Sequence, residues 1–227
     1  MDMFTYSINN PNNININVGN DNIDKCHFVP FGHRCTSAIS IQAAGLRNQS
    51  LPFDWTIPAL PNRIKAVLEQ DFADFVPDVP RTFFNKYGLG LAHFNGNITE
   101  GIDQYNRRLD RFRNIMNDNI KKKYFVYINE DYLYNNEYRK DKFNNTVFNE
   151  MLELENFLKQ KYPQLKYNII YFNFMKHSIP KNSNIVNIVL KTTSKLFDKE
   201  SGSYSILTPF RNKCGSILQE IFNIDKN

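Results

Sequence analysis

Short apolar runs separated by amphipathic segments most constrain how this chain can fold. The runs at 123–128 and 167–172 are rich in aromatic and β-branched residues, and a third run covers 185–190. Apolar runs of this length are typical of strands that are buried on both faces. The segment 98–116 instead repeats its apolar residues at spacings of three and four, which predicts an amphipathic helix. Alternating strands and helices favour a mostly parallel sheet with helices on both faces.

The N-terminal half continues this alternation. Residues 26–31 form an apolar run closed by Gly32 and predict a strand, and the small and apolar residues that follow from 36 to 44 predict a helix. The chain is therefore predicted to be a single α/β domain over residues 25–227, with a three-layer, Rossmann-like arrangement. Further elements are expected as helices through 64–72, 147–158 and 215–221, a strand over 87–94, and an ordered loop at 50–55.

Residues 1–24 differ from the rest of the chain in composition. Asparagine dominates the segment 7–22, and apolar residues there are too few to bury a face of their own. We therefore expect a mobile, asparagine-rich N-terminal arm. The alternation of Ile14, Ile16 and Val18 leaves an edge strand as the alternative.

Charge gives weak indications about partners. The net charge is +5 and the pI about 9.0, and basic residues cluster only at Lys121–Lys123 and along one predicted helix. A solvated helix face is the expected explanation, and specific nucleic-acid binding is not expected. The helix residues concerned are Arg107, Arg108, Arg111 and Arg113.

Cysteine usage and the N-terminus indicate a compartment. The three cysteines are an odd number without the paired spacing of a disulfide framework or a zinc site, so we expect reduced thiols, no metal and no cofactor. The first residues lack a basic flank and an apolar stretch, and no apolar run is long enough to span a bilayer. These features predict a cytoplasmic protein, in the host cytoplasm or the virion if the chain is viral. The oligomeric state cannot be deduced.

Cys35 is the candidate chemical centre. It follows Gly32-His33-Arg34, where the first strand ends and the helix begins, and ligands bind at the carboxyl ends of parallel strands. A thiol at a helix start lies near unpaired N–H groups and the positive end of the helix dipole, which favour the thiolate. Arg34 and His33 are expected to act in the same direction. Cys26 and Cys214 are expected to be structural.

A thiol nucleophile also needs a base and often a group that orients it. Of the four histidines, His93 at the end of a predicted strand is the best placed, and His177 is the second choice. Asp54, in the loop after the first helix, is the best orienting partner. Asp54 has an alternative role as the ion-pair partner of Arg47, and we favour that pairing over binding of an anionic substrate by Arg47.

Several segments in order resemble a known family. Phe31-Gly32-x-x-Cys35-x-x-Ala38, Gly45-Leu46-Arg47, Leu51-Pro52-Phe53-Asp54-Trp55, His93-Phe94 and Tyr105-x-x-Arg108-x-x-x-Phe112 are similar to the papain-like cysteine peptidase family of bacteria and large DNA viruses, first catalogued as a domain of unknown function. The similarity covers about residues 27–130. It implies that Cys35 is the nucleophile and His93 the base, with Asp54 as third member.

These observations together predict a cysteine hydrolase, as a peptidase, amidase or acyltransferase. Its expected substrate is a peptide, an amide or a glycan-linked molecule, with no membrane partner. Two alternatives stay open. One is a non-enzymatic binding or virion-associated protein that uses the arginine-rich helix, and the other is a glycan-modifying enzyme in which Trp55 stacks on a sugar. Candidate substrate-binding residues are Arg47, Trp55, His33 and Asn95.

Overall fold

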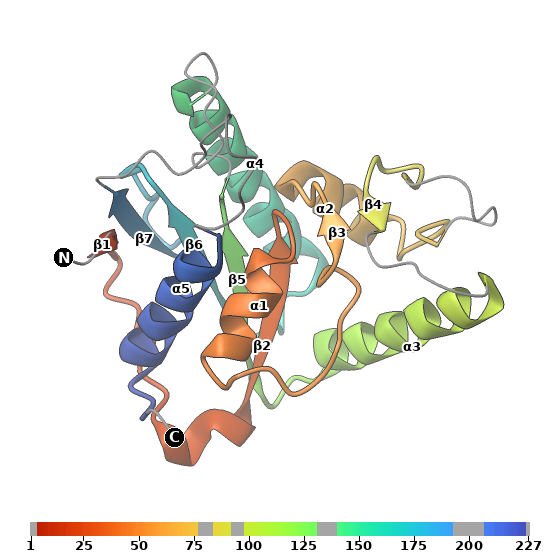
Figure 1. Cartoon of the computed structure of the whole chain (residues 1–227), viewed down its shortest axis with the longest axis horizontal. Coiled ribbons are helices and arrows are strands. Elements are labelled where there is room, and N and C mark those ends of the chain that lie inside the picture. The colour runs from red at the N-terminus through yellow and green to blue at the C-terminus, as the bar shows by residue number, and fades with distance from the viewer. Residues whose placement is uncertain (1–3, 77–83, 92–97, 131–139, 193–206, 226–227) are drawn as a thin grey trace.

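The chain forms a five-stranded, mostly parallel sheet between two layers of helices, and the predicted three-layer α/β fold is confirmed. The computed structural model describes residues 4–76, 84–91, 98–130, 140–192 and 207–225. The strand order is β1-β7-β6-β5-β2 (Figure 1). The strands are β1 (Phe4–Asn9), β2 (Cys26–Gly32), β5 (Lys122–Ile128), β6 (Tyr167–Asn173) and β7 (Ile185–Thr192).

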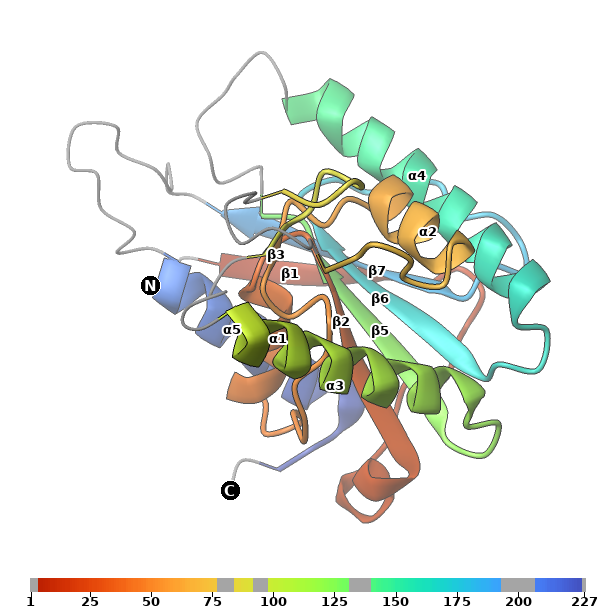
Figure 2. The ribbon, with the colours of Figure 1, turned by 90° about the vertical axis from the view of Figure 1, so that its right-hand side faces the viewer.

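Two hydrophobic cores lie on opposite faces of the sheet. One core contains residues of α1 and α5, and the other contains residues of α2, α3 and α4. Figure 2 shows α2 and α4 on one side of the sheet and α1 and α5 on the other. The helices are α1 (Thr36–Ala43), α2 (Pro61–Glu69), α3 (Ile98–Asn117), α4 (Lys140–Lys161) and α5 (Leu207–Phe222).

The central strand β5 shows why the predicted strands are continuous apolar runs. Phe125 and Tyr127 belong to the core under α2, α3 and α4, whereas Tyr124 and Val126 belong to the core under α1 and α5. Successive side chains of a strand point to opposite faces. Because helices cover both faces of the sheet, successive positions of β5 are all apolar.

The parallel strands follow one another in chain order from one edge of the sheet. β2 forms that edge and pairs with β5, β5 pairs with β6, and β6 pairs with β7, all in parallel. The carboxyl ends of these strands therefore lie along the same side of the molecule. Cys35 follows the carboxyl end of the edge strand.

The N-terminal segment differs from the expected mobile arm. β1 pairs antiparallel with β7 from Phe4 to Asn9 and so adds a strand to the sheet. Ile16 and Val18 are buried in the core under α5, and the Val18 N–H donates to the carbonyl of Phe222 at 3.0 Å. The arm prediction is thus wrong for the described residues, because a few apolar residues spaced along a polar segment suffice to cover an existing core. A 3₁₀ turn, Asn20–Lys25, then leads into β2.

The region between α2 and α3 is also less regular than expected. In place of a strand over 87–94, the described part contains the two-residue strand β4 (Gly90–Leu91), which pairs with β3 (Thr56–Ile57). Residues 92–97 lie outside the described residues. Leu89 and Leu91 alternate with glycines, and glycine weakens a strand. The segment therefore forms a short pairing with β3 and not a strand of the main sheet.

Candidate functional site

The passage from β2 to α1 is fixed by close backbone packing. Gly32 has a φ of +106°, and a Cβ atom there would collide with Ala59, so only glycine fits. Ser37 in the first turn of α1 donates to the Gly32 carbonyl, and its hydroxyl accepts the Ile128 N–H at 3.1 Å. These bonds tie the start of α1 to the ends of β2 and β5. Cys35 is consequently held in a defined position.

The sulfur of Cys35 contacts a guanidinium group. Arg211 on α5 donates from Nη2 to the sulfur at 3.3 Å and from Nε to the Thr36 hydroxyl at 3.1 Å. Among the described residues, the hydrogen-bond partner of the sulfur is therefore an arginine, which the sequence did not indicate. A cation at this distance stabilises the thiolate form.

Glu130 binds the two residues on either side of Cys35 in the sequence. Its carboxylate is fully buried, lies 3.2 Å from Nε of Arg34 and accepts a hydrogen bond from the Thr36 hydroxyl. Thr36 thus connects Glu130 to Arg211. We refer to Arg34, Cys35, Thr36, Glu130 and Arg211 as the Cys35 network.

Close packing of two helices places Arg211 beside the thiol. Gly215, one turn after Arg211, faces α1, and a Cβ atom there would lie 2.8 Å from the Ala43 Cβ. The Ser40 hydroxyl also donates to the Arg211 carbonyl at 3.2 Å. A larger residue at 215 would push α5 away from α1, and Arg211 with it.

The expected acidification of the Cys35 thiol is not observed. Burial raises the pKa of Cys35 above the usual thiol value, and the charge of Glu130 acts in the same direction. Arg211, the backbone N–H of Cys35 and Arg34 each lower this pKa, but burial has the largest effect. The helix start and the basic neighbours therefore limit the increase without reversing it, because a half-buried thiolate loses hydration.

The other two cysteines are more completely buried. Cys214 is 0% exposed and Cys26 is 8% exposed, whereas Cys35 is of intermediate exposure. Burial raises the pKa of both Cys214 and Cys26. Cys35 is thus the cysteine that combines access from solvent with a cationic neighbour.

Three of the four histidines are placed by the structure. His33 is buried, and burial lowers its pKa to about 3, with Arg34 and Arg63 adding to the effect. It is neutral at physiological pH, so the expected charge support for the thiolate from His33 is wrong. His177 stacks on Phe148 with ring centroids 4.1 Å apart, and its pKa is lowered by burial. His27 pairs with Asp118.

His93 and Asn95 lie outside the described residues. Two assignments therefore stay predictions: His93 as the base and Asn95 as a substrate contact.

Asp54, Arg47 and Trp55 form a second group of contacts. The buried Asp54 carboxylate is ion-paired with Arg47 and accepts the Leu51 N–H at 3.1 Å, so the favoured pairing is confirmed. The Arg47 guanidinium lies 5.9 Å from the centre of the Trp55 ring. Burial raises the pKa of Asp54, and the Arg47 contact and the nearby charge of Arg108 oppose this increase. These contacts hold the loop after α1 in place.

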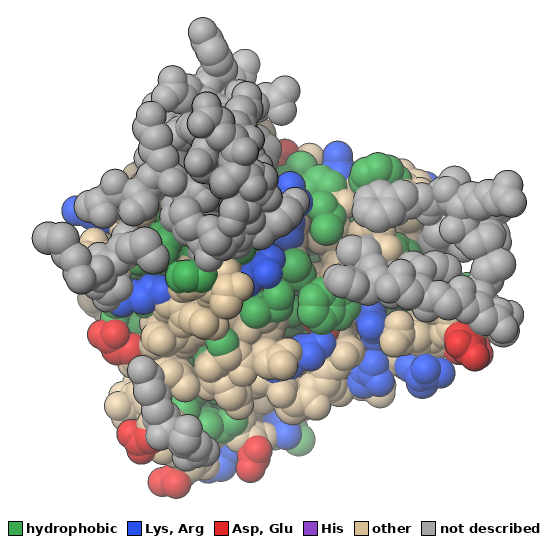
Figure 3. All heavy atoms as spheres, viewed as in Figure 1, with side chains coloured by type: hydrophobic (Ala, Val, Ile, Leu, Met, Phe, Trp, Pro, Cys, Tyr) green, Lys and Arg blue, Asp and Glu red, His purple; other side chains and the backbone are tan. Residues whose placement is uncertain are grey.

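The arginine-rich helix is less exposed than expected. Figure 3 shows basic side chains over α3. Arg108, however, is only 6% exposed and lies 4.8 Å from the Tyr105 ring, so its assignment to a solvated face is wrong. Arg111 donates to the Ser50 carbonyl at 2.9 Å, and Arg113 lies 3.4 Å from Asp71. Arg111 and Arg113 thus attach α3 to the loop after α1 and to the segment after α2.

Glu130 and Arg211 were not among the candidates from sequence. Glu130 follows the carboxyl end of a predicted strand, and that position could have indicated it. Arg211 lies before the predicted start of the last helix, and no local pattern marks it. Within the described ranges, no group of three or more His, Cys, Asp or Glu side chains could hold a metal ion. None of the described helices is both long and apolar enough to cross a membrane.

Comparisons with protein-family models, with curated proteins and with solved structures each gave no match. The resemblance to the papain-like cysteine peptidase family therefore stays a prediction.

Proposed function

We propose that the protein is a thiol-dependent hydrolase or acyltransferase that acts on an amide or ester, with Cys35 as the nucleophile. The observation that carries the proposal is the position of this thiol at the carboxyl edge of the parallel sheet, half-buried and 3.3 Å from the Arg211 guanidinium. Ligands of open α/β sheets bind at this edge. The other two cysteines are buried.

The raised pKa of Cys35 defines what the site must supply. At neutral pH the group is mainly the thiol, so a base has to remove its proton before attack. We assign this step to His93, which then passes the proton to the leaving amine or alcohol. Arg211 stabilises the sulfur anion until the thioester forms, and water or an acceptor nucleophile then cleaves the thioester.

Two further groups have defined roles in this proposal. Backbone N–H groups at the start of α1 hold the oxyanion, because the first turn of a helix leaves its amides without partners inside the helix. Asp54 holds Arg47 and the Leu51 amide through Oδ2, which leaves Oδ1 for the predicted role of orienting the base. Glu130 positions Arg34 and Thr36.

Acylation of the full-length protein by p-nitrophenyl esters and fluorogenic peptide amides tests the proposal. We expect an acyl adduct on Cys35 by mass spectrometry and its loss, together with turnover, in Cys35→Ala. Cys26→Ala is the matched control and should retain both. His93→Gln should lower kcat by about 10²–10⁴-fold if it is the base. Equal turnover in Cys35→Ala and the unmodified protein would contradict the proposal.

A further inference from the structure

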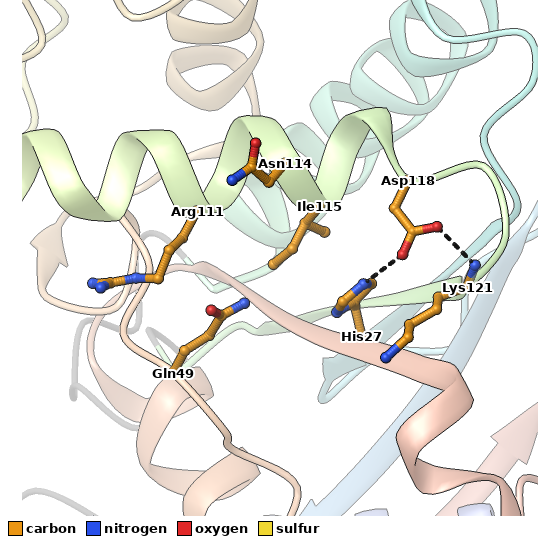
Figure 4. A pocket seen from close by; sticks show the side chains of 7 residues that line it. All are labelled: His27, Gln49, Arg111, Asn114, Ile115, Asp118 and Lys121. Atoms are coloured by element: carbon orange, nitrogen blue, oxygen red, sulfur yellow. Dashed lines mark hydrogen bonds and ion pairs between the residues drawn. The ribbon is translucent and has the colours of Figure 1, made fainter.

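A second site lies at the opposite end of β2. A pocket of about 310 Å³ is lined by residues of β2, the last turns of α3, the loop after α1 and the turn before β5 (Figure 4). His27 is near the amino end of β2 and Cys35 follows its carboxyl end, so the pocket is about 20 Å from the thiol at the usual rise of a strand. The pocket is therefore separate from the Cys35 network.

One carboxylate lines this pocket, and its hydrogen-bonding capacity is already used. Asp118 Oδ2 lies 3.0 Å from Nε2 of His27, while Oδ1 accepts the N–H groups of Ile120 at 2.8 Å and Lys121 at 3.1 Å. The bond from Lys121, followed by that from His27, lowers the pKa of Asp118, so the group is ionised. Asp118 thus orients His27 and leaves little capacity for a cationic ligand.

The remaining polar groups of the wall are mainly hydrogen-bond donors. Arg111 uses only Nε, which donates to the Ser50 carbonyl at 2.9 Å. Among the described residues, its terminal nitrogens and the Lys121 ammonium make no further hydrogen bond or ion pair. Nε2 of His27 donates to Asp118 and burial lowers the pKa of the ring, so its buried Nδ1 is an acceptor and not a donor. Figure 4 shows Gln49 and His27 on one side of the space and Ile115 on the other.

We propose that this pocket binds a small molecule through a phosphate or carboxylate group. Arg111 and Lys121 supply two positive charges against one carboxylate that is already engaged, so the uncompensated charge is positive. The Gln49 amide donates a further hydrogen bond, and Ile115 packs against the apolar part of the ligand. The volume is at the small end of the range of ligand sites, which suits a molecule of metabolite size. Charge-assisted hydrogen bonds of this kind are the strong ones.

Titration with two simple anions tests the proposal. Inorganic phosphate or acetate is added to the full chain at constant ionic strength, and the imidazole signals of His27 are followed by NMR. We expect a saturable shift of the His27 signals, and the anion that binds more tightly identifies the group that the pocket recognises. Lys121→Gln should weaken binding by about tenfold, as expected for loss of one charge-assisted bond.

A matched control separates a site from general attraction. Arg107 is exposed on the same helix and does not line the pocket, so Arg107→Gln should leave the affinity unchanged. The proposal would be overturned by the absence of a saturable shift with both anions, or by equal losses in Lys121→Gln and Arg107→Gln. The result does not depend on Cys35, because the Cys35→Ala variant should bind the same anion with unchanged affinity.

Discussion

Asp54 and Glu130 are both fully buried carboxylates with arginine partners. The partners of Asp54 are close to it in sequence, whereas those of Glu130 are distant. Asp54 binds Arg47 and the Leu51 amide, both within the loop that contains it. Glu130 follows β5 and contacts Arg34 and Thr36 at the start of α1, and Thr36 in turn accepts a hydrogen bond from Arg211 on α5. The first group stabilises one loop, whereas the second joins three elements around a half-buried thiol.

The largest effect is expected from removing the charge of Asp54. Asp54→Asn leaves Arg47 and the buried Arg108 without their counter-charge, and breaking a buried pair lowers the free energy of unfolding by about 3–5 kcal/mol. Urea denaturation measures this change. Asp74→Asn removes an ion pair with Lys86 in which Asp74 is 73% exposed, and it should leave the free energy of unfolding nearly unchanged. Equal losses in the two variants would show that burial does not determine the strength of these pairs.

Glu130→Gln should be less destabilising than Asp54→Asn. Arg34 is 33% exposed and can be rehydrated when its partner is neutral, so we expect a loss of about 1–3 kcal/mol. The pKa of Cys35 should also fall, because the Glu130 charge contributes to raising it. The pH dependence of Cys35 alkylation measures that shift. An unchanged profile would mean that Glu130 has a purely structural role.

Arg211→Gln should have the smallest effect on stability and an effect of opposite sign on the thiol. Because Arg211 lowers the pKa of Cys35, its removal should raise that pKa and reduce alkylation at pH 8 by about three- to tenfold. Lys213→Gln removes a charge from the same helix that does not contribute to the pKa shift of Cys35, and it serves as the control. If both variants react at the same rate as the unmodified protein, the Arg211 contact does not influence the thiol.

The difference between local and distant partners also explains which features could be predicted from the sequence. The buried strands, the three layers and the Arg47–Asp54 pair follow from periodicity or from residues seven positions apart, so they could be predicted locally. The Glu130–Thr36–Arg211 connection depends on how α5 packs on α1, and a single glycine at 215 permits that approach. Burial of Arg108 and of His33 likewise depends on tertiary packing, which composition does not indicate.

The direction of the Cys35 pKa shift illustrates the limit most clearly. A helix start and neighbouring basic residues are visible in the sequence, and both favour the thiolate. The extent of burial is not visible, and it has the larger effect. Predicting the reactivity of a cysteine therefore requires both the effect of its burial and the effect of the charges beside it.

The special reactivity of Cys35 can be measured as the rate of iodoacetamide alkylation of each cysteine at a series of pH values, followed by mass spectrometry. We expect Cys35 to react ahead of Cys26 and Cys214, with an apparent pKa above the usual thiol value that rises in Arg211→Gln and falls in Glu130→Gln. Equal labelling of the three cysteines, or a Cys35 profile that neither variant moves, would show that the network around Cys35 does not control this thiol.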